Sequence, residues 1–225
     1  MRNLLRKPDF QGIESSEVES EIVAETFKLT PKLIFGTMHD INFDNSTEDI
    51  LYFPTFSQVK TRHSNSDIKA LNCFIQSIKD AQDRIWILDA YLFKPEGKEI
   101  NESLINKKIN EILAWFDEET SASSIRFMTR KTDGLEALKE KCEEHMQLIN
   151  TSKVGKKGRV SINLKYLPEA FEIIHDRFAI VDNELWHFGA AVAGLNAGLN
   201  ASSRGWSAKT SKAIIFFDEI WNQVK

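Results

Sequence analysis

Residues 174–189, which read IHDRFAIVDNELWHFG, decide the fold of this chain. Two short apolar runs, Phe178–Val181 and Leu185–Phe188, flank the polar residues 182–184, which have the composition of a turn. Short runs rich in β-branched and aromatic side chains, separated by turn residues, are typical of a β-hairpin. The segment therefore predicts two adjacent antiparallel strands, with His175 shortly before the first.

The chain on either side of this hairpin alternates between helical and extended patterns. Some segments carry apolar residues at helical spacing, whereas others alternate or run continuously apolar. On this basis we expect helices over 67–82, 106–117, 134–149 and 218–225, and further strands over 84–93, 124–129, 160–167 and 213–217. Residues 189–205, rich in Gly, Ala and Asn, are expected to form a loop. The alternation of helices and strands predicts an α/β domain.

The regular patterning begins at Asp67, which suggests a division of the chain at that point. We expect residues 67–225 to form one domain and residues 1–66 to form a partly irregular N-terminal extension. Within the extension, residues 15–26 are a candidate helix and Leu33–Phe35 a candidate strand.

The composition is that of an ordinary globular protein, with 42% hydrophobic and 28% charged residues. The formal net charge of −4 argues against a protein that coats nucleic acid by charge alone, because that mode requires a broad basic face. The sequence contains neither a signal-peptide core nor an apolar run long enough to span a membrane, so we expect a cytoplasmic protein.

Cysteine usage gives no indication of a metal site or of disulfides. Cys73 and Cys142 have no second Cys or His at ligand spacing, and they are expected to be free thiols. The basic segment Lys153–Arg159 has two interpretations, a solvated loop or a loop that faces a phosphate. We expect neither a metal nor a cofactor.

The hairpin segment resembles the signature of the phospholipase D superfamily, which reads His, any residue, Lys, four residues, Asp, six residues, Gly-Ser. His175, Asp182 and Gly189 match it, while Arg177 stands at the Lys position and Ala190 at the Ser position. The resemblance covers roughly residues 67–225. It implies a phospholipase D-like lobe with a mixed β-sheet flanked by helices.

The resemblance also implies roles for these residues. His175 would attack phosphorus as the nucleophile without a metal, Arg177 would hold the phosphate, and Asp182 would orient the motif. Gly189 and Ala190 would let backbone N–H groups approach the phosphate. The catalytic candidates are thus His175, Arg177 and Asp182, and the phosphate-binding candidates are Arg177, Gly189 and Ala190.

Departures from the signature leave several functions open. Arg177 cannot lose its proton as a Lys can, and Ala190 and Val192 stand where the family has Ser and Asn. A metal-independent phosphodiesterase or nuclease, as in a bacterial defence effector, is one hypothesis. The second is a degenerate lobe that binds a phosphate ligand or a partner protein as a sensor or adaptor. The third is an interaction subunit of a larger complex.

The number of motifs bears on oligomeric state. Active members of the superfamily bring two His-containing motifs together, whereas this sequence shows one, and Asp89-Ala-Tyr91 at the corresponding upstream position lacks a His. Either two chains pair to form a composite site, or the catalytic half is missing. The first alternative predicts a homodimer. The resemblance implies nucleic acid or another phosphodiester as substrate.

Each residue of the signature also has a purely structural interpretation. His175 could be an inert histidine at a strand edge, while Arg177 and Asp182 could form a salt bridge or support a turn. His187 is expected to serve packing, as are Trp186 and Trp206.

Overall fold

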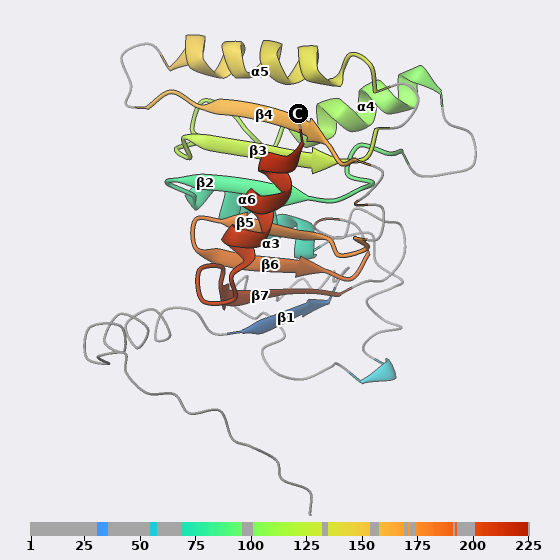
Figure 1. The fold of residues 1–225 in the computed structure, drawn as a ribbon, viewed down its shortest axis with the longest axis vertical. Coiled ribbons are helices and arrows are strands. Elements are labelled where there is room, and N and C mark those ends of the chain that lie inside the picture. Colours follow the sequence, from blue (N-terminus) through green and yellow to red (C-terminus); the bar gives the residue numbers. More distant parts are fainter. Residues whose placement is uncertain are drawn as a thin grey trace, which may run out of the picture.

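The computed structural model describes residues 31–35, 55–57, 69–95, 101–131, 135–153, 158–168, 171, 174–190, 192 and 201–224. Its elements are β1 Lys32–Phe35, α3 Lys69–Asp80, β2 Arg84–Leu88, α4 Glu102–Leu113, β3 Ser124–Thr129, α5 Leu138–Ser152, β4 Ser161–Tyr166, β5 Phe178–Val181, β6 Glu184–Phe188, β7 Ala201–Ser207 and α6 Ala213–Gln223. The strands form one seven-stranded sheet in the order β1-β7-β6-β5-β2-β3-β4 (Figure 1).

The sheet is mixed, as predicted. β2, β3 and β4 are parallel to one another, whereas β5 pairs antiparallel with β2, and β6, β7 and β1 continue the antiparallel half. The carboxyl ends of the parallel strands therefore meet the amino end of β5 at one edge. This junction places the residues after β2 and β3 beside those before β5.

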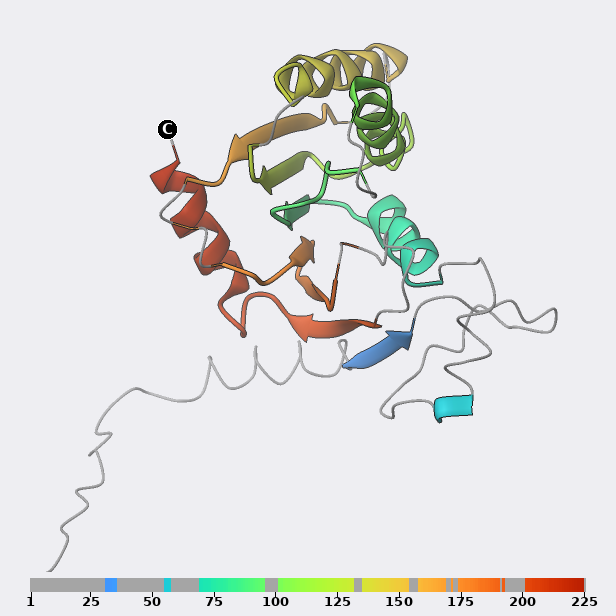
Figure 2. The ribbon, with the colours of Figure 1, turned by 90° about the vertical axis from the view of Figure 1, so that its right-hand side faces the viewer.

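Helices cover both faces of the sheet, which confirms the α/β class (Figure 2). α3, α4 and α5 contribute to one buried cluster, represented by Phe74, Ile109 and Leu138. α6 contributes Phe217 and Trp221 to a second cluster on the opposite face. The sheet is thus the middle of three layers.

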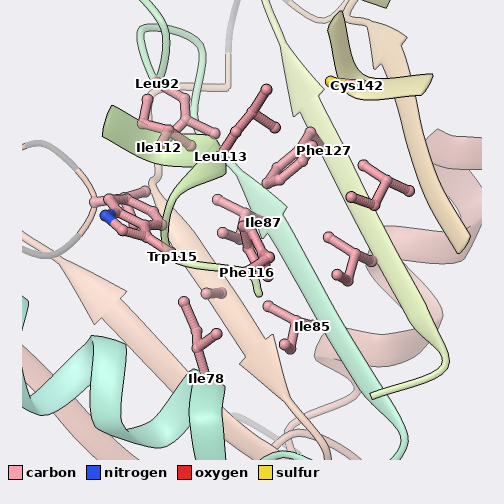
Figure 3. Packing of buried hydrophobic residues seen from close by; sticks show 14 of the residues in the cluster. Ile78, Ile85, Ile87, Leu92, Ile112, Leu113, Trp115, Phe116, Phe127 and Cys142 are labelled. Carbon is pink, nitrogen blue, oxygen red and sulfur yellow. The ribbon is translucent and has the colours of Figure 1, made fainter. Parts of the chain in front are cut away.

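β2 shows why the central strands read as continuous apolar runs. Ile85 and Ile87 enter the cluster beneath α3, α4 and α5, while Trp86 and Leu88 enter the α6 cluster. Figure 3 shows part of the first cluster, which includes Ile87 and Phe116. Because neither face meets solvent, the alternation of polar and apolar residues is lost.

The expected second strand ends earlier than predicted. The apolar pattern suggested residues 84–93, but β2 stops at Leu88 and a turn follows. The cause is Asp89, whose carboxylate accepts a hydrogen bond from the Tyr91 N–H at 2.8 Å. Such a side-chain turn competes with the strand ladder and ends it.

The predictions for the C-terminal region were partly wrong. Residues 213–217 form the first half of α6 and not a strand. β7 begins at Ala201, within the segment 189–205 that was expected to be a loop, and runs on to Ser207. The run AIIFF has no periodicity of its own, so a buried helix and a strand cannot be told apart there. In α6, Phe217, Ile220 and Trp221 supply the buried stripe.

The candidate strand in the N-terminal extension is confirmed. β1 pairs antiparallel with β7 and forms an edge of the same sheet as the rest of the domain. The candidate helix over 15–26 lies outside the described residues.

Candidate functional site

The candidate site lies where the carboxyl ends of β2 and β3 meet the amino end of β5. Leu88, the last residue of β2, is paired with Phe178, the first of β5. Asp89, just after β2, and Arg177, just before β5, therefore lie opposite each other. Arg130, which follows β3, donates its backbone N–H to Ala90 O at 3.2 Å and joins the same edge.

Asp89 anchors this edge. Its side chain is fully buried, and its Oδ1 lies 3.5 Å from Arg177 Nε. The Tyr91 and Val192 N–H groups donate to the same carboxylate at 2.8 and 3.1 Å. Buried carboxylates persist when they are paired and hydrogen-bonded, and these contacts supply both conditions. The carboxylate thereby ties together the β2 turn, the chain before β5 and Val192.

Burial and the partners of Asp89 have opposite effects on its pKa. Burial raises the pKa of Asp89 above the ordinary value of 3.8, although the Tyr91 and Val192 N–H groups and the Arg177 guanidinium all act to lower it. Desolvation is thus the larger effect, and the carboxylate gains from any further positive charge at this edge.

Tyr91 gathers positive charge next to Asp89. The Arg177 guanidinium carbon lies 5.5 Å from the centroid of its ring, that of Arg130 lies 5.4 Å away, and Lys94 Nζ lies 5.5 Å away. Arg130 also donates to the Tyr91 hydroxyl at 3.2 Å. Cations within about 6 Å of a ring are attracted by its electron-rich face. We call Lys94, Arg130 and Arg177 the Tyr91 cation cluster.

His175 lies at the exposed margin of this edge, two residues before Arg177. Arg177 is fixed to the sheet by its backbone as well as its side chain, since its carbonyl accepts the Phe188 N–H at 2.9 Å. The Arg177 side chain retains 24% of its exposure, so its guanidinium is both held by Asp89 and open to solvent. An exposed imidazole and an anchored guanidinium suit the capture of an anion.

The packing roles expected for three other residues have mixed outcomes. Trp186 is fully buried, which confirms the prediction. His187 and Trp206 are exposed, so the prediction was wrong for both. His187 Nε2 lies 3.6 Å from Asp176 Oδ1. Near a sheet margin, strand alternation does not reveal whether any layer covers the side chain.

Asp182 lies at the opposite end of β5 from Arg177, about 16 Å away at the usual rise per strand residue. Its carboxylate accepts the backbone N–H groups of Gln82, Asp83 and Arg84 at 2.7–3.2 Å. Its φ of 54° is left-handed, which suits the hairpin turn. The structure therefore separates Asp182 from His175 and Arg177 and uses it to hold the turn between α3 and β2.

The Gly189 N–H donates to Ala201 O at 3.0 Å, and a Cβ at Gly189 would lie 3.1 Å from that oxygen. Glycine therefore favours the close approach of β7, which a larger residue would have to push back slightly. Because the N–H groups of Gly189 and Val192 are both engaged within the chain, the backbone here has fewer donors for an anion than the sequence suggested. Ala190 is half-buried beside them.

The sequence did not identify the partner of Arg177 or the role of Arg130. The sequence placed Asp89 inside the expected strand 84–93 and singled it out only as part of Asp89-Ala-Tyr91, the upstream position that lacks a His. An acidic residue within an apolar run that is buried on both faces is the available signal, because its burial requires a partner.

Candidate metal ligands do not gather in the described part of the chain, where no group of three His, Cys, Asp or Glu side chains could hold an ion. Both cysteines are free, and burial raises the pKa of Cys142 to about 12. Among the described helices, none is both long and apolar enough to cross a bilayer.

Comparison with known proteins gave structural similarities only. No protein-family model and no curated protein matches the chain. The archaeal chromatin protein TrmBL2 aligns with a TM-score of 0.39 and 14% identity over 93% of this chain, which spans 59% of TrmBL2.

Two further solved structures are also similar. Nuc from Salmonella typhimurium, a phospholipase D family member, has a TM-score of 0.40 and 17% identity over 68% of this chain and 88% of its own. NucT from Helicobacter pylori has a TM-score of 0.43 and 9% identity over 86% of this chain and 98% of its own. At these values the similarities assign no family to the chain.

Proposed function

We propose that this chain is a metal-independent phosphodiesterase or nuclease-type protein in which His175 is the nucleophile and Arg177 the phosphate clamp. The observation that carries the proposal is the Arg177 side chain, which is partly exposed and is held in place by the buried Asp89 carboxylate. Arg177 also lies two residues after an exposed histidine, His175. Prior anchoring removes much of the entropy that a free side chain would lose on binding phosphate.

The proposed reaction proceeds in two displacements. An imidazole nitrogen of His175 forms a bond to phosphorus while the bond to one ester oxygen breaks, and that oxygen takes a proton from solvent and leaves as an alcohol. Water then attacks the phosphohistidine, loses a proton to solvent and breaks the P–N bond, which returns the imidazole and releases a phosphomonoester. Arg177 would stabilise the non-bridging oxygens as charge builds on them.

The second candidate function is binding without turnover. Arg177 replaces the Lys of the signature, and the N–H groups of Gly189 and Val192 are already engaged within the chain. A guanidinium holds phosphate strongly, and few N–H donors remain to stabilise the transition state. Both features favour retention of the ligand over its cleavage. Such a lobe would serve as a phosphate-ligand sensor or as an adaptor for a partner protein.

The proposal extends to the setting of the protein. We propose a cytoplasmic homodimer, because one motif per chain supplies one nucleophilic histidine, and a role as a defence effector that acts on nucleic acid. Protein partners in a larger complex belong to the second candidate function.

The test measures cleavage of single- and double-stranded DNA, RNA and bis-p-nitrophenyl phosphate in EDTA. Wild type is compared with His175→Ala and with His145→Ala, a histidine of α5 that contacts the Phe116 carbonyl, as control. Cleavage that persists in EDTA, disappears in His175→Ala and remains in His145→Ala is expected. Equal cleavage by wild type and His175→Ala would overturn the assignment. Ligand binding without cleavage in any variant would favour the second candidate.

A further inference from the structure

We propose that Lys94 and Arg130 extend the Arg177 phosphate clamp into a short binding track for single-stranded nucleic acid, so that the chain grips consecutive phosphates. The inference rests on the proposed function, in which Arg177 takes the reacting phosphate. It narrows the proposed nucleic-acid ligand to a single strand and adds two residues that nothing in the signature indicates.

The dimensions of the Tyr91 cation cluster fit such a strand. Each positive centre lies 5.4–5.5 Å from the ring centroid. Any two of them are therefore at most about 11 Å apart. Neighbouring phosphates of one strand can therefore contact different members of the cluster at the same time.

The cluster is assembled from three separate segments. Lys94 follows β2, Arg130 follows β3, and Arg177 precedes β5. The carboxyl edge of parallel strands is the usual ligand-binding edge of open α/β sheets, above all where the strand order changes direction. β2 is such a point, because the next strands, β3 and β4, lie on one side of it and the later strands, β5 and β6, lie on the other.

The positive charge of this cluster is local and opposite in sign to the net charge of the chain. The whole chain has a formal net charge of −4, yet three cations approach one aromatic ring at this edge. Their mutual repulsion is lowered when a polyanion binds among them. Sites that bind single-stranded nucleic acid usually combine cationic side chains with aromatic rings.

Exposure makes Lys94 the most informative position. Lys94 is exposed, whereas Arg130 is half-buried and bonded to the Tyr91 hydroxyl. A substitution at Lys94 therefore removes charge with little structural effect. Lys79, an exposed lysine in the last turn of α3, is a matched control outside the cluster.

The experiment measures the fluorescence anisotropy of labelled oligothymidylates of two and twelve nucleotides with the full chain, over a range of salt. The variants are Lys94→Ala, Lys94→Arg, Arg130→Gln and Lys79→Ala. We expect the 12-mer to bind at least about tenfold more tightly than the dimer, and Lys94→Ala to weaken the 12-mer about fivefold. The slope of log K against log salt should fall by about 0.7 in that variant. Lys94→Arg should restore binding, and Lys79→Ala should match wild type.

The inference is overturned if Lys94→Ala equals Lys79→Ala, or if both oligomers bind equally. Binding to vesicles of phosphatidylserine and phosphatidylcholine that is lost in Lys94→Ala, without oligonucleotide binding, would overturn it in favour of a lipid headgroup. Turnover of bis-p-nitrophenyl phosphate separates the two proposals. Length-dependent binding without turnover supports the track and rejects hydrolysis, whereas turnover without length dependence rejects the track alone.

Discussion

At the scale of single residues, Asp89 determines what Arg177 can do. The carboxylate is buried and receives two backbone N–H groups as well as the guanidinium. Removal of one partner from a buried ion pair leaves the other uncompensated, so the two residues form one unit. Arg177 can present its remaining N–H groups to an anion because Asp89 holds the Nε side.

Asp89 should make stability depend on pH. Burial raises its folded-state pKa above 3.8, so the folded state binds the proton more tightly than the unfolded state does. The stabilising contribution of the protonated form is complete below pH 3.8 and is lost as the pH rises through the raised pKa. We therefore expect the stability of wild type to fall relative to Asp89→Asn over that window. Urea unfolding of both proteins from pH 3 to pH 8 measures the difference, and a constant difference would contradict the expectation.

Asp182 should contribute to stability and not to chemistry. Asp182→Ala removes the acceptor of three backbone N–H groups and introduces a residue that rarely adopts φ near 54°. We expect a loss of about 2–3 kcal/mol in the free energy of unfolding. Asp182→Asn, which tolerates this φ and keeps one acceptor oxygen, should lose about half as much.

The control for Asp182 is the function of the distant edge. At a temperature well below unfolding, oligonucleotide binding and any cleavage by Asp182→Asn should equal those of wild type. A loss of activity with retained stability would place Asp182 in the chemistry after all. Chemical denaturation followed by circular dichroism, with anisotropy on the same preparations, distinguishes the two results.

At the scale of elements, the predictable parts are those whose pattern is local. The hairpin of β5 and β6 follows from apolar runs around residues 182–184, and β4 follows from alternation. β7 has the sequence ASSRGWS, which is too weakly apolar to indicate a strand. It forms a strand because its backbone pairs with β1 on one side and β6 on the other. In the same way, Arg177 could be identified by spacing, whereas Arg130 joins it only through the pairing of β3 with β2.

α6 is held to the sheet by polar contacts as well as by its apolar stripe. Lys165 of β4 donates from Nζ to the Trp221 and Val224 carbonyls at 2.9 and 2.6 Å, which satisfies acceptors at the end of the helix. Lysine near a helix C-terminus also interacts favourably with the helix dipole. These bonds fix the C-terminal end of α6 over β4.

Lys165→Met should therefore destabilise the fold without altering the site. We expect a loss of about 1–3 kcal/mol in unfolding free energy, because two carbonyl acceptors lose a charged donor. Lys79→Met, at an exposed position in the last turn of α3, is the matched control and should change stability by less than about 0.5 kcal/mol. Equal stability of the two variants would show that the apolar stripe alone holds α6.

At the scale of the whole molecule, one edge of the sheet collects the candidate chemistry. The parallel half brings Asp89 and Arg130 to this edge, and the antiparallel half brings His175 and Arg177. The mixed topology thus unites residues from distant parts of the sequence. Each chain nevertheless supplies one histidine of the signature. If the proposed reaction needs two such histidines, two chains must come together to form one active site.

A site shared between two chains should lose specific activity on dilution. Dissociation of a dimer follows mass action, so the fraction of paired chains falls once the concentration is below the dissociation constant. We expect turnover per chain to decline in parallel with the dimer fraction measured by sedimentation velocity on the same samples. Turnover per chain that stays constant while the dimer dissociates would show that His175 and Arg177 of one chain suffice, and the homodimer would then have no part in the chemistry.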